Sequence, residues 1–373
     1  MRSPLPRVLW WLAVLGGWAC SSSREEKRPD TAQATPAPSP QPAAAPAAVG
    51  AVVVEHPNGE ARRLRNIRQV TFDGRRNAEP YFSPDGRQIV FQSVRGDNPF
   101  YQLFVMDPDG RNARMISTGK GQATCAAFAP DRPRILFASS HLDPDAWPAA
   151  RARDLAAQEE EARKTGQPIS SWEVNAAMDL FEVDLDGKNI TRLTTNPGYD
   201  AEGSYSPDGK RILFTSLREG DLDLYIQDVG KEAATRLTTT PGYDGSGFFS
   251  PDGKRVVFRS FRAGDQTSDL YLINADGTGE QRLTDLKGVS WSPFFHPDGK
   301  RVIFSSNLRP NTQTPGQNFD LYLLDLETRA LERVTYEGGY DGLPSFSPDG
   351  KTLAWTSARQ GGTNQIFLAD WVD

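Results

Sequence analysis

Short apolar stretches recur along most of the chain, and each is followed by a stretch in which apolar and polar residues alternate. Ile212-Leu213-Phe214 and Val302-Ile303-Phe304 represent the first kind, and Asp221–Ile226 and Asp320–Leu324 the second. Short apolar runs bounded by turn residues are typical of buried strands, and a period of two is typical of half-buried strands. The pattern therefore predicts many short β-strands and an all-β fold.

A tetrapeptide, Ser-Pro-Asp-Gly or a close variant, precedes each of these strand pairs. Its copies are Ser83–Gly86, Ala129–Arg132, Ser206–Gly209, Ser250–Gly253, His296–Gly299 and Ser347–Gly350. The prolines are 46, 77, 44, 46 and 51 residues apart, so one interval contains an insertion. Proline fixes φ early in a tight turn and glycine adopts conformations that other residues resist, so each copy predicts a hairpin.

A last short strand with Arg-Leu-Thr or a similar sequence closes each unit. Its copies are 190–194, 235–238, 281–284 and 331–335. Asp-Gly pairs such as Asp186-Gly187 predict the turn before this strand. Each unit of about 45 residues thus holds four strands, here named A to D in chain order, which is typical of a β-propeller blade.

The two ends of the chain predict how the ring closes. The sixth unit reaches Asp373 after only three strands, the third being Gln365–Ala369. Ile67–Thr71 near the other end has the pattern of Ile190–Thr194. This N-terminal strand should complete the last blade and remove the free edges. We therefore expect a six-bladed β-propeller over residues 51–373.

The Ser-Pro-Asp-Gly, Asp-Leu-Tyr and Arg-Leu-Thr signatures resemble the WD-repeat-like blades of the TolB family, which are periplasmic partners of the Tol–Pal envelope system. The resemblance extends over residues 62–373. It implies a propeller and a place in the bacterial cell envelope. TolB carries a small α/β domain ahead of its propeller, where this sequence has a Pro/Ala-rich segment, so the resemblance informs the fold more than the biology.

The first 20 residues are typical of an export signal. Arg2 and Arg7 flank the start of the apolar run Val8–Trp18, which is too short to span a bilayer. Gly17-Trp18-Ala19-Cys20 resembles a bacterial lipobox, with Gly17 where that pattern prefers leucine. Lipidation of Cys20 and an ordinary cleaved signal both predict export to the periplasm, and lipidation adds anchoring to a membrane.

Residues 21–50 differ in composition from the repeat region. Proline and alanine dominate from Pro36 to Ala48, and such a segment cannot bury a core. We expect a disordered tether between the anchor and the propeller.

Charge and rare residues narrow the functions. The chain has 42 Lys and Arg against 48 Asp and Glu, a net charge of −6, so no basic field favours nucleic acid as a partner. It has three histidines and two cysteines, too few for His-rich or Cys-rich metal sites.

Successive strands of a blade alternate in direction, so the A–B and C–D turns share one face and the B–C loops and D–A links share the other. The second face carries the irregular segments, including the insertion at 141–177 in blade two, where Pro148 and Gly166 bracket an expected helix at about 149–164. That helix is interpreted either as a solvated decoration of the rim or as a lid. Binding is expected on this face, since variable loops on a rigid ring commonly carry it.

Gly-Tyr-Asp recurs on the D–A links, which lead into the innermost strand and edge the central channel. The candidate binding residues at the channel mouth are Tyr199, Asp200, Glu202, Tyr243, Asp244, Tyr340, Asp341 and Glu79. One interpretation is an acidic, aromatic-rimmed mouth for a cationic group, a metal ion or a protein loop. The other is that the tyrosines pack against the next blade while the aspartates cap turns or pair with arginines.

Arginines follow strand B in most units, at Arg95, Arg218, Arg262, Arg309 and Arg359. Together with aspartates near the start of strand C, at Asp221, Asp269 and Asp320, they could form a ligand site, but their repetition in nearly every blade favours ion pairs within each blade.

The sequence favours binding over catalysis. It has no Gly-x-Ser-x-Gly elbow, His141 and His296 are expected on opposite faces, and Cys125 is expected to be a buried small residue on the link into blade two. We therefore expect a monomeric, non-enzymatic platform for an envelope protein or peptide, touching the membrane only through its lipid anchor and requiring no cofactor. Two alternatives stay open: a periplasmic hydrolase or lyase that uses channel-mouth carboxylates, with or without a divalent cation, and a propeller whose aspartate ring binds structural calcium.

Overall fold

The computed structural model describes residues 58–143, 174–263, 267–308, 318–360 and 363–373, all within one compact unit, Ala45–Asp373. The export signal with Cys20, the Pro/Ala-rich segment and the expected helix at about 149–164 lie outside these residues. Within them, the only helix is the short 3-10 turn η1 (Gly59–Arg62), and no helix is suited to crossing a membrane.

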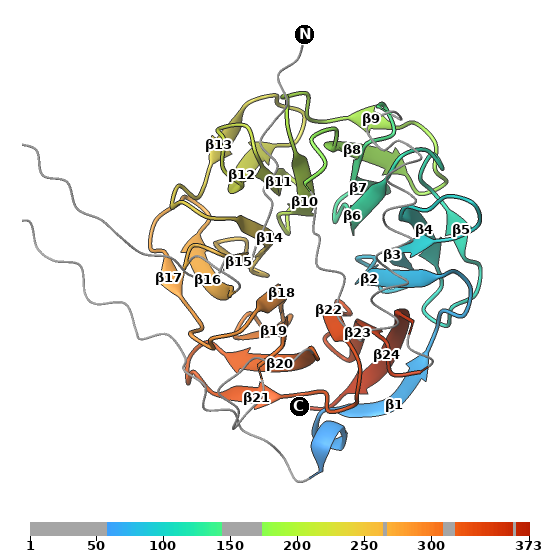
Figure 1. Cartoon of the computed structure of the whole chain (residues 1–373), viewed down its shortest axis with the longest axis vertical. Helices are drawn as coiled ribbons and strands as arrows, with labels where there is room; N and C mark the ends of the chain where they lie inside the picture. The colour runs from blue at the N-terminus through green and yellow to red at the C-terminus, as the bar shows by residue number, and fades with distance from the viewer. Residues whose placement is uncertain (1–57, 144–173, 264–266, 309–317, 361–362) are drawn as a thin grey trace, which may run out of the picture. The chain divides into compact units, whose positions relative to one another are not determined.

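Six four-stranded antiparallel sheets are arranged around a central axis, as predicted (Figure 1). Blade 1 contains β2 (Arg76–Phe82), β3 (Ile89–Val94), β4 (Gln102–Met106) and β5 (Arg114–Met115). Blade 2 contains β6 (Ala123–Phe128), β7 (Arg134–Ser139), β8 (Asp179–Asp184) and β9 (Thr191–Arg192). Blade 3 contains β10 (Asp200–Tyr205), β11 (Arg211–Ser216), β12 (Asp223–Asp228) and β13 (Ala234–Arg236).

The remaining blades repeat this order from the inside outward. Blade 4 contains β14 (Asp244–Phe249), β15 (Arg255–Ser260), β16 (Asp269–Asn274) and β17 (Gln281–Arg282). Blade 5 contains β18 (Ser290–Phe295), β19 (Arg301–Ser306), β20 (Asp320–Asp325) and β21 (Leu331–Arg333). Blade 6 contains β22 (Asp341–Phe346), β23 (Thr352–Ser357), β24 (Gln365–Trp371) and, outermost, β1 (Leu64–Gln69).

The ring closes through β1, which confirms the predicted closure. β1 pairs antiparallel with β24, with Leu64 opposite Trp371 and Gln69 opposite Phe367. The strand starts at Leu64, three residues before the predicted Ile67. The first and last strands of the described propeller thus share one sheet, in which β24 is paired on both sides and β1 forms the outer edge.

The Ser-Pro-Asp-Gly segments form the predicted A–B hairpins. In blade 3, the Ser206 hydroxyl donates to Asp208 at 2.6 Å and accepts the Arg211 N–H at 2.9 Å. Gly209 has φ +70°, a conformation that favours glycine. The tetrapeptide is therefore a local device that turns the chain and satisfies its own polar groups.

The Arg-Leu-Thr segments fasten strand D to strand C. In blade 4, Arg282 pairs with Asp269 at 2.6 Å, Leu283 is fully buried, and the Thr284 hydroxyl accepts the Leu270 N–H at 2.9 Å. The aspartate at the start of strand C therefore pairs with strand D, which corrects the expected pairing with the arginine after strand B.

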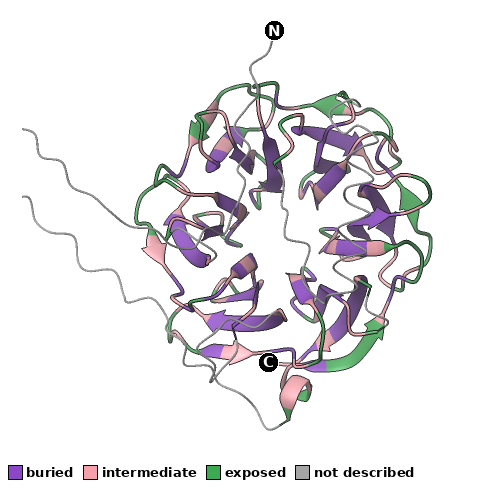
Figure 2. Cartoon of the chain, in the orientation of Figure 1, coloured by how far each residue is buried: buried purple, intermediate pink, exposed green. Residues whose placement is uncertain are grey.

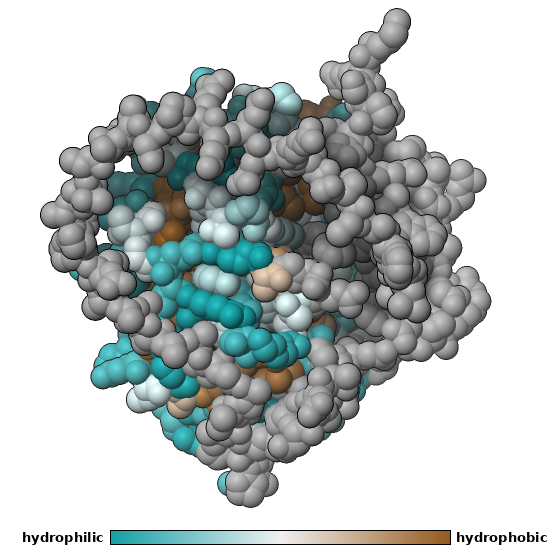
Figure 3. All heavy atoms as spheres, turned by 60° about the vertical axis from the view of Figure 1, so that its left-hand side comes forward, coloured by the Kyte–Doolittle hydropathy of each residue, from teal (hydrophilic) through white to brown (hydrophobic). Residues whose placement is uncertain are grey.

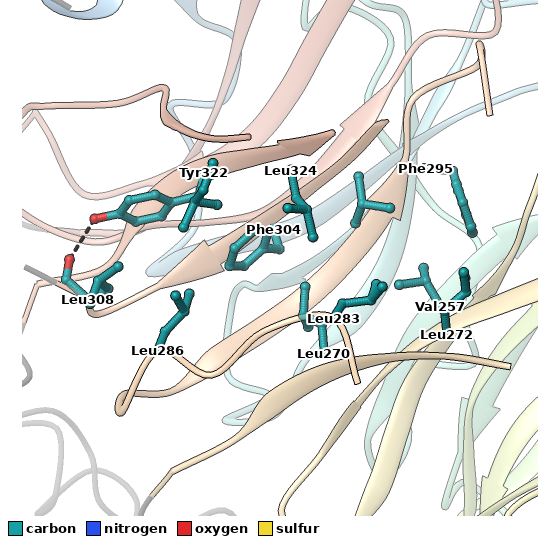
Figure 4. Close-up of a cluster of buried hydrophobic side chains, with 12 residues drawn as sticks. Val257, Leu270, Leu272, Leu283, Leu286, Phe295, Phe304, Leu308, Tyr322 and Leu324 are labelled. Carbon is teal, nitrogen blue, oxygen red and sulfur yellow. Dashed lines mark hydrogen bonds between the residues drawn. The ribbon is translucent and has the colours of Figure 1, made fainter. Parts of the chain in front are cut away.

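Apolar side chains fill the space between neighbouring blades. Figure 4 shows the cluster between blades 4 and 5, where Leu270, Phe304 and Tyr322 are buried and the Tyr322 hydroxyl donates to the Leu308 carbonyl at 2.6 Å. The inner three strands of each blade are largely buried, whereas short outer strands such as β5 and β9 are exposed (Figure 2). On the side near β13 and β17, hydrophilic residues form most of the visible described surface (Figure 3).

Candidate functional site

Every inner strand contains a β-bulge, where the pairing with strand B shifts register. The residue at the bulge has a left-handed backbone, with φ between 49° and 58°. These six residues are Glu79, Cys125, Glu202, Ser246, Ser292 and Leu343. A bulge redirects a side chain at the cost of local strain, and bulges of this kind concentrate near functional sites.

Five of these six residues line one pocket in the central channel. The pocket is lined by Glu79, Tyr81, Cys125, Ala127, Glu202, Gly203, Ser246, Phe248 and Ser292. Its cavity is small, about 20 Å³ by the measure in which one water molecule needs about 10 to 15 Å³. The bulges therefore give the channel an acidic and hydroxyl-rich lining.

Three aromatic rings lie across the channel two positions further along the inner strands, toward the A–B turns. The ring centroids of Tyr81 and Phe248 are 5.6 Å apart, those of Phe248 and Phe294 are 5.1 Å apart, and those of Tyr81 and Phe294 are 6.1 Å apart. Tyr81 comes from blade 1 and the phenylalanines from blades 4 and 5, so the contacts cross the ring. Tyr81 and Phe248, which line the pocket, therefore lie on the side of it that faces the A–B turns.

Glu202 is buried and held by several donors. Its carboxylate accepts the Tyr243 hydroxyl at 2.6 Å, the Ser246 N–H at 2.8 Å and the Thr215 hydroxyl at 2.9 Å. Arg259 donates to it at 3.1 Å. Burial alone would raise the pKa of Glu202, but the Arg259 charge and these hydrogen bonds outweigh burial and lower the pKa below its usual value. Glu202 is therefore ionised.

Arg259 is fully buried and joins three blades around Glu202. Its guanidinium carbon lies 3.9 Å from the ring centroid of Trp291 in blade 5 and 4.4 Å from that of Tyr243. It also donates to the Ser246 hydroxyl. Glu202 compensates the charge of Arg259, and the rings of Tyr243 and Trp291 pack against its guanidinium. Arg259 therefore holds the side of the channel formed by blades 3 to 5 in place.

Glu79 has a contrasting environment. The Tyr81 hydroxyl donates to its carboxyl at 3.3 Å, and its own backbone N–H donates to Thr356 of blade 6 at 3.0 Å. Burial in the channel, followed by the charge of Glu202, raises the pKa of Glu79 to about 7. Two carboxyls of one pocket thus differ in charge near neutral pH.

The three predicted aspartates lie in ion pairs within the blades. Asp200 pairs with Arg218 at 3.2 Å, Asp244 with Arg262 at 2.9 Å, and Asp341 with Arg359 at 3.0 Å. Each aspartate is at most 1% exposed. Burial raises the pKa of all three, that of Asp244 to about 6, against the lowering effect of its arginine.

This geometry agrees with the interpretation in which the aspartates pair with arginines. The carboxylates are enclosed within blades rather than exposed at a channel mouth. In blades 3, 4 and 6 the arginine after strand B pairs with the first residue of strand A, so Arg218 contacts Asp200 and not Asp221. In blade 1, Arg95 instead donates to Ser93 and Asn77. Arg309 lies outside the described residues.

The three predicted tyrosines lie beside the inner strands. Tyr199 is buried in the core between blades 2 and 3. Tyr243 and Tyr340 are half-buried and lie over Gly245 and Gly342, where an added Cβ would come within 2.7 Å and 2.2 Å of them. Of these three tyrosines, Tyr243 alone has a described hydrogen bond to a pocket residue, Glu202.

The structure brings Glu79 and Glu202 together and adds residues that were not predicted. Cys125 lies within β6 and not on a link, and its side chain lines the pocket. Burial in the channel raises the pKa of its thiol. Ser246, Ser292 and Arg259 were missed. One spacing could have found the serines, because each bulge residue stands four positions before the first residue of a Ser-Pro-Asp-Gly turn.

The described residues contain no group of three or more His, Cys, Asp or Glu side chains placed to hold a metal ion. The role of calcium stays a prediction.

Comparisons with known proteins agree with this architecture. Residues 223–314 match the family model described as TolB beta propeller domain. The chain is 28% identical over 145 residues to a Protein TolB homolog of Chlorobium chlorochromatii, a match covering 36% of this chain and 32% of that protein. It is 29% identical over 154 residues to the Tol-Pal system protein TolB of Bordetella pertussis, covering 36% of this chain and 33% of that protein. The matches thus span about a third of the length of these relatives.

Solved structures show the same fold at low sequence identity. A putative TolB from Agrobacterium tumefaciens superimposes with a TM-score of 0.53 at 20% identity, covering 80% of this chain and 90% of that one. An oligogalacturonate lyase in complex with manganese superimposes with a TM-score of 0.51 at 15% identity, covering 82% of this chain and 93% of that one. The family match, the curated relatives and the six four-stranded blades together lead to one conclusion: the chain is a TolB-like six-bladed β-propeller.

Proposed function

We propose that this chain is exported to the periplasm, is anchored to a membrane through lipidated Cys20, and acts as a monomeric, non-enzymatic platform for a protein or peptide of the cell envelope. The similarity to a Tol-Pal system protein supports an envelope role, and the sequence of residues 1–20 supports export. A role within the Tol–Pal system is part of the proposal.

The observation that carries the proposal is the one-sided channel. Tyr81, Phe248 and Phe294 lie across it on the side of the A–B turns, and the bulge residues beyond them form a pocket. We place the partner on the face that carries the B–C loops and D–A links, because the three rings lie on the other side of the bulge residues. A rigid ring with a small polar pocket under variable loops is suited to holding a protruding segment of another protein.

The test is capture of a partner by the immobilised full chain, kept in a mild non-ionic detergent, from a bacterial envelope extract. Ala127 lines the pocket and is half-buried, so Ala127→Leu fills the pocket without changing charge. We expect the wild type to capture a defined protein, identified by mass spectrometry, and Ala127→Leu to lose it.

Two controls separate loss of binding from loss of fold. Ala127→Leu should unfold within a few degrees of the wild type by circular dichroism. Glu232→Gln, an exposed change between β12 and β13 of blade 3, should capture as the wild type does. Equal capture by Ala127→Leu and the wild type, or no specific capture by either, would overturn the proposed site.

One observation favours a second candidate, a hydrolase or lyase. Glu79 has a pKa raised to about 7 while Glu202 is ionised, and two carboxyls with separated pKa values are a common acid–base arrangement. This candidate requires turnover of an envelope substrate. Glu79→Gln should abolish that turnover, and Ala127→Leu should weaken binding of the substrate. The calcium interpretation is tested separately, because chelation should then lower the unfolding temperature of the wild type.

A further inference from the structure

One polar atom in the channel pocket lacks a partner. The Ser292 hydroxyl oxygen is buried and makes no hydrogen bond with any described residue, and Ser292 as a whole is only 5% exposed. Ser292 lines the pocket together with Glu79 and Ser246. A buried hydroxyl without a partner carries a free-energy cost that a bound donor would remove.

The pocket offers acceptors and aromatic rings but no cation of its own. None of the described residues that line it is a lysine, arginine or histidine. The nearest buried cation, Arg259, is already engaged by Glu202, Ser246 and Trp291. Glu79 has no arginine or lysine among its described hydrogen-bond partners, so when it ionises only neutral groups of Tyr81 and Cys125 hydrogen-bond to its carboxylate.

We propose that this pocket binds a primary ammonium group, presented as a lysine side chain by the partner protein. An ammonium group has three donors, which match the Glu79 carboxylate and the Ser292 and Ser246 hydroxyls. The floor made by Phe248 and Tyr81 adds aromatic faces for the cation, and Ala127 lies at the same level of the inner strands as these rings. This inference rests on the proposed function, since it names the chemistry that the partner brings to the same pocket.

An ammonium group fits better than the other common cations. A guanidinium is a planar fork that favours a bidentate carboxylate, and Glu202, the other carboxylate here, is occupied by Arg259. The described residues offer no group of three or more acidic, cysteine or histidine ligands for a metal ion.

Binding of an ammonium group should depend on pH through Glu79. The titratable and charged groups around Glu79 are Glu202, Tyr81, Cys125 and Tyr340, with Arg259 behind Glu202. Burial keeps Tyr81, Cys125 and Tyr340 neutral at neutral pH because it raises their pKa values. Glu79, with a pKa of about 7, is then the group that titrates, and only its ionised form pairs with the cation. The affinity should rise about tenfold between pH 6 and pH 8.

The experiment is calorimetric titration of the full chain in a non-ionic detergent with Nα-acetyl-lysine methylamide. Nα-acetyl-norleucine methylamide, which lacks the ammonium group, is the matched neutral probe, and putrescine tests whether free amines bind equally well. We expect binding of the lysine probe and none of the norleucine probe. Weaker binding of putrescine than of the lysine probe supports a lysine of a protein as the source of the ammonium group. Equal or tighter binding of putrescine would show that the source is not a protein lysine.

Two variants locate the binding. Glu79→Gln should weaken the lysine probe about tenfold or more and remove the pH dependence, and Ser292→Ala should weaken it about threefold without loss of stability. Glu232→Gln and Ser204→Ala are the matched controls, because Glu232 is exposed and the Ser204 hydroxyl is already bonded to the Gly247 carbonyl at 2.8 Å. Both controls should bind as the wild type does.

The outcomes separate this inference from the proposed function. If the wild type captures an envelope protein but does not bind the lysine probe, or if Glu79→Gln binds the probe as tightly as the wild type, the ammonium inference is wrong while the platform stands. If the lysine probe binds and no envelope protein is captured, the proposed platform function is wrong, and so is the proposal that a partner protein presents the lysine.

Discussion

The stability of the propeller should report the protonation of Glu79. Its pKa is raised from 4.5 to about 7 in the folded chain, so the folded state holds a proton that the unfolded state has already released. Stability from this group is fully present below pH 4.5 and is lost as pH rises through 7. Glu79→Gln keeps the shape and the hydrogen bond from Tyr81 but has no proton to lose.

The magnitude follows from the size of the shift. A difference of about 2.5 pKa units corresponds to about 3 kcal/mol, nearly all of it developed by pH 8 and only about 1 kcal/mol of it by pH 5. The variant should therefore gain about 2 kcal/mol over the wild type between these two pH values. Changes in other groups, including Asp244, cancel in this difference because both proteins share them.

The assay is urea unfolding of both proteins at several pH values from about 5 to about 8.5, followed by circular dichroism. Glu232→Gln, which removes an exposed carboxylate, should differ from the wild type by a constant amount across this range. A constant difference for Glu79→Gln as well would refute the reasoning, because it would mean that Glu79 titrates alike in the folded and unfolded chains.

Three further predictions concern the blades and their closure. Arg262→Ala leaves the buried Asp244 carboxylate without its partner and should lower the free energy of unfolding by about 3 kcal/mol in urea, whereas Arg87→Ala, on the surface, should have little effect. Gly110→Ala places a Cβ 2.2 Å from the Val70 carbonyl oxygen, at a backbone φ of +86°, and should lower the melting temperature by several degrees. Gly230 has a similar φ of +76° but no atom within 4 Å of an added Cβ, so Gly230→Ala should lower the melting temperature less. Equal losses in the two variants would rule out the clash with Val70. Arg63→Ala removes hydrogen bonds of 2.8 to 3.1 Å to Glu332 in blade 5. The variant should speed amide hydrogen exchange in β1 and β24 but not in β12. Equal acceleration in all three strands would contradict a role of Arg63 that is confined to the closure of the ring.

The sequence was sufficient for the architecture because each blade is a local unit with its own turn chemistry. The Ser206 hydroxyl and Asp208 fix one hairpin within six residues, and Arg282 and Thr284 fasten strand D to the neighbouring strand C. Six such units with one strand missing at the end leave little choice but closure by the N-terminal strand. Contacts of this kind depend on residues near one another in the chain, which a sequence shows directly.

The channel depends on residues that are far apart in the chain, and the sequence was less informative there. Glu202 and Glu79 were identified, but the contact of Arg259 with Glu202 spans 57 positions and carries no motif. The Gly-Tyr-Asp repeat drew attention to Asp200, Asp244 and Asp341, although their burial beside arginines was one of two interpretations the sequence allowed. Repetition in several blades indicates a role in building blades, whereas a binding pocket is made where blades differ.

The bulge in each inner strand allows such differences to arise without disturbing the fold. Its side chain is a carboxylate, a thiol, a hydroxyl or a leucine, yet the backbone geometry is the same at all six positions. In blade order the residues are Glu79, Cys125, Glu202, Ser246, Ser292 and Leu343, so both acidic positions lie within blades 1 to 3, whereas blades 4 to 6 contribute neutral ones. At the bulge positions the sixfold repetition of the backbone is therefore broken only by the side chains, and a cationic ligand on the axis would favour the side of blades 1 to 3.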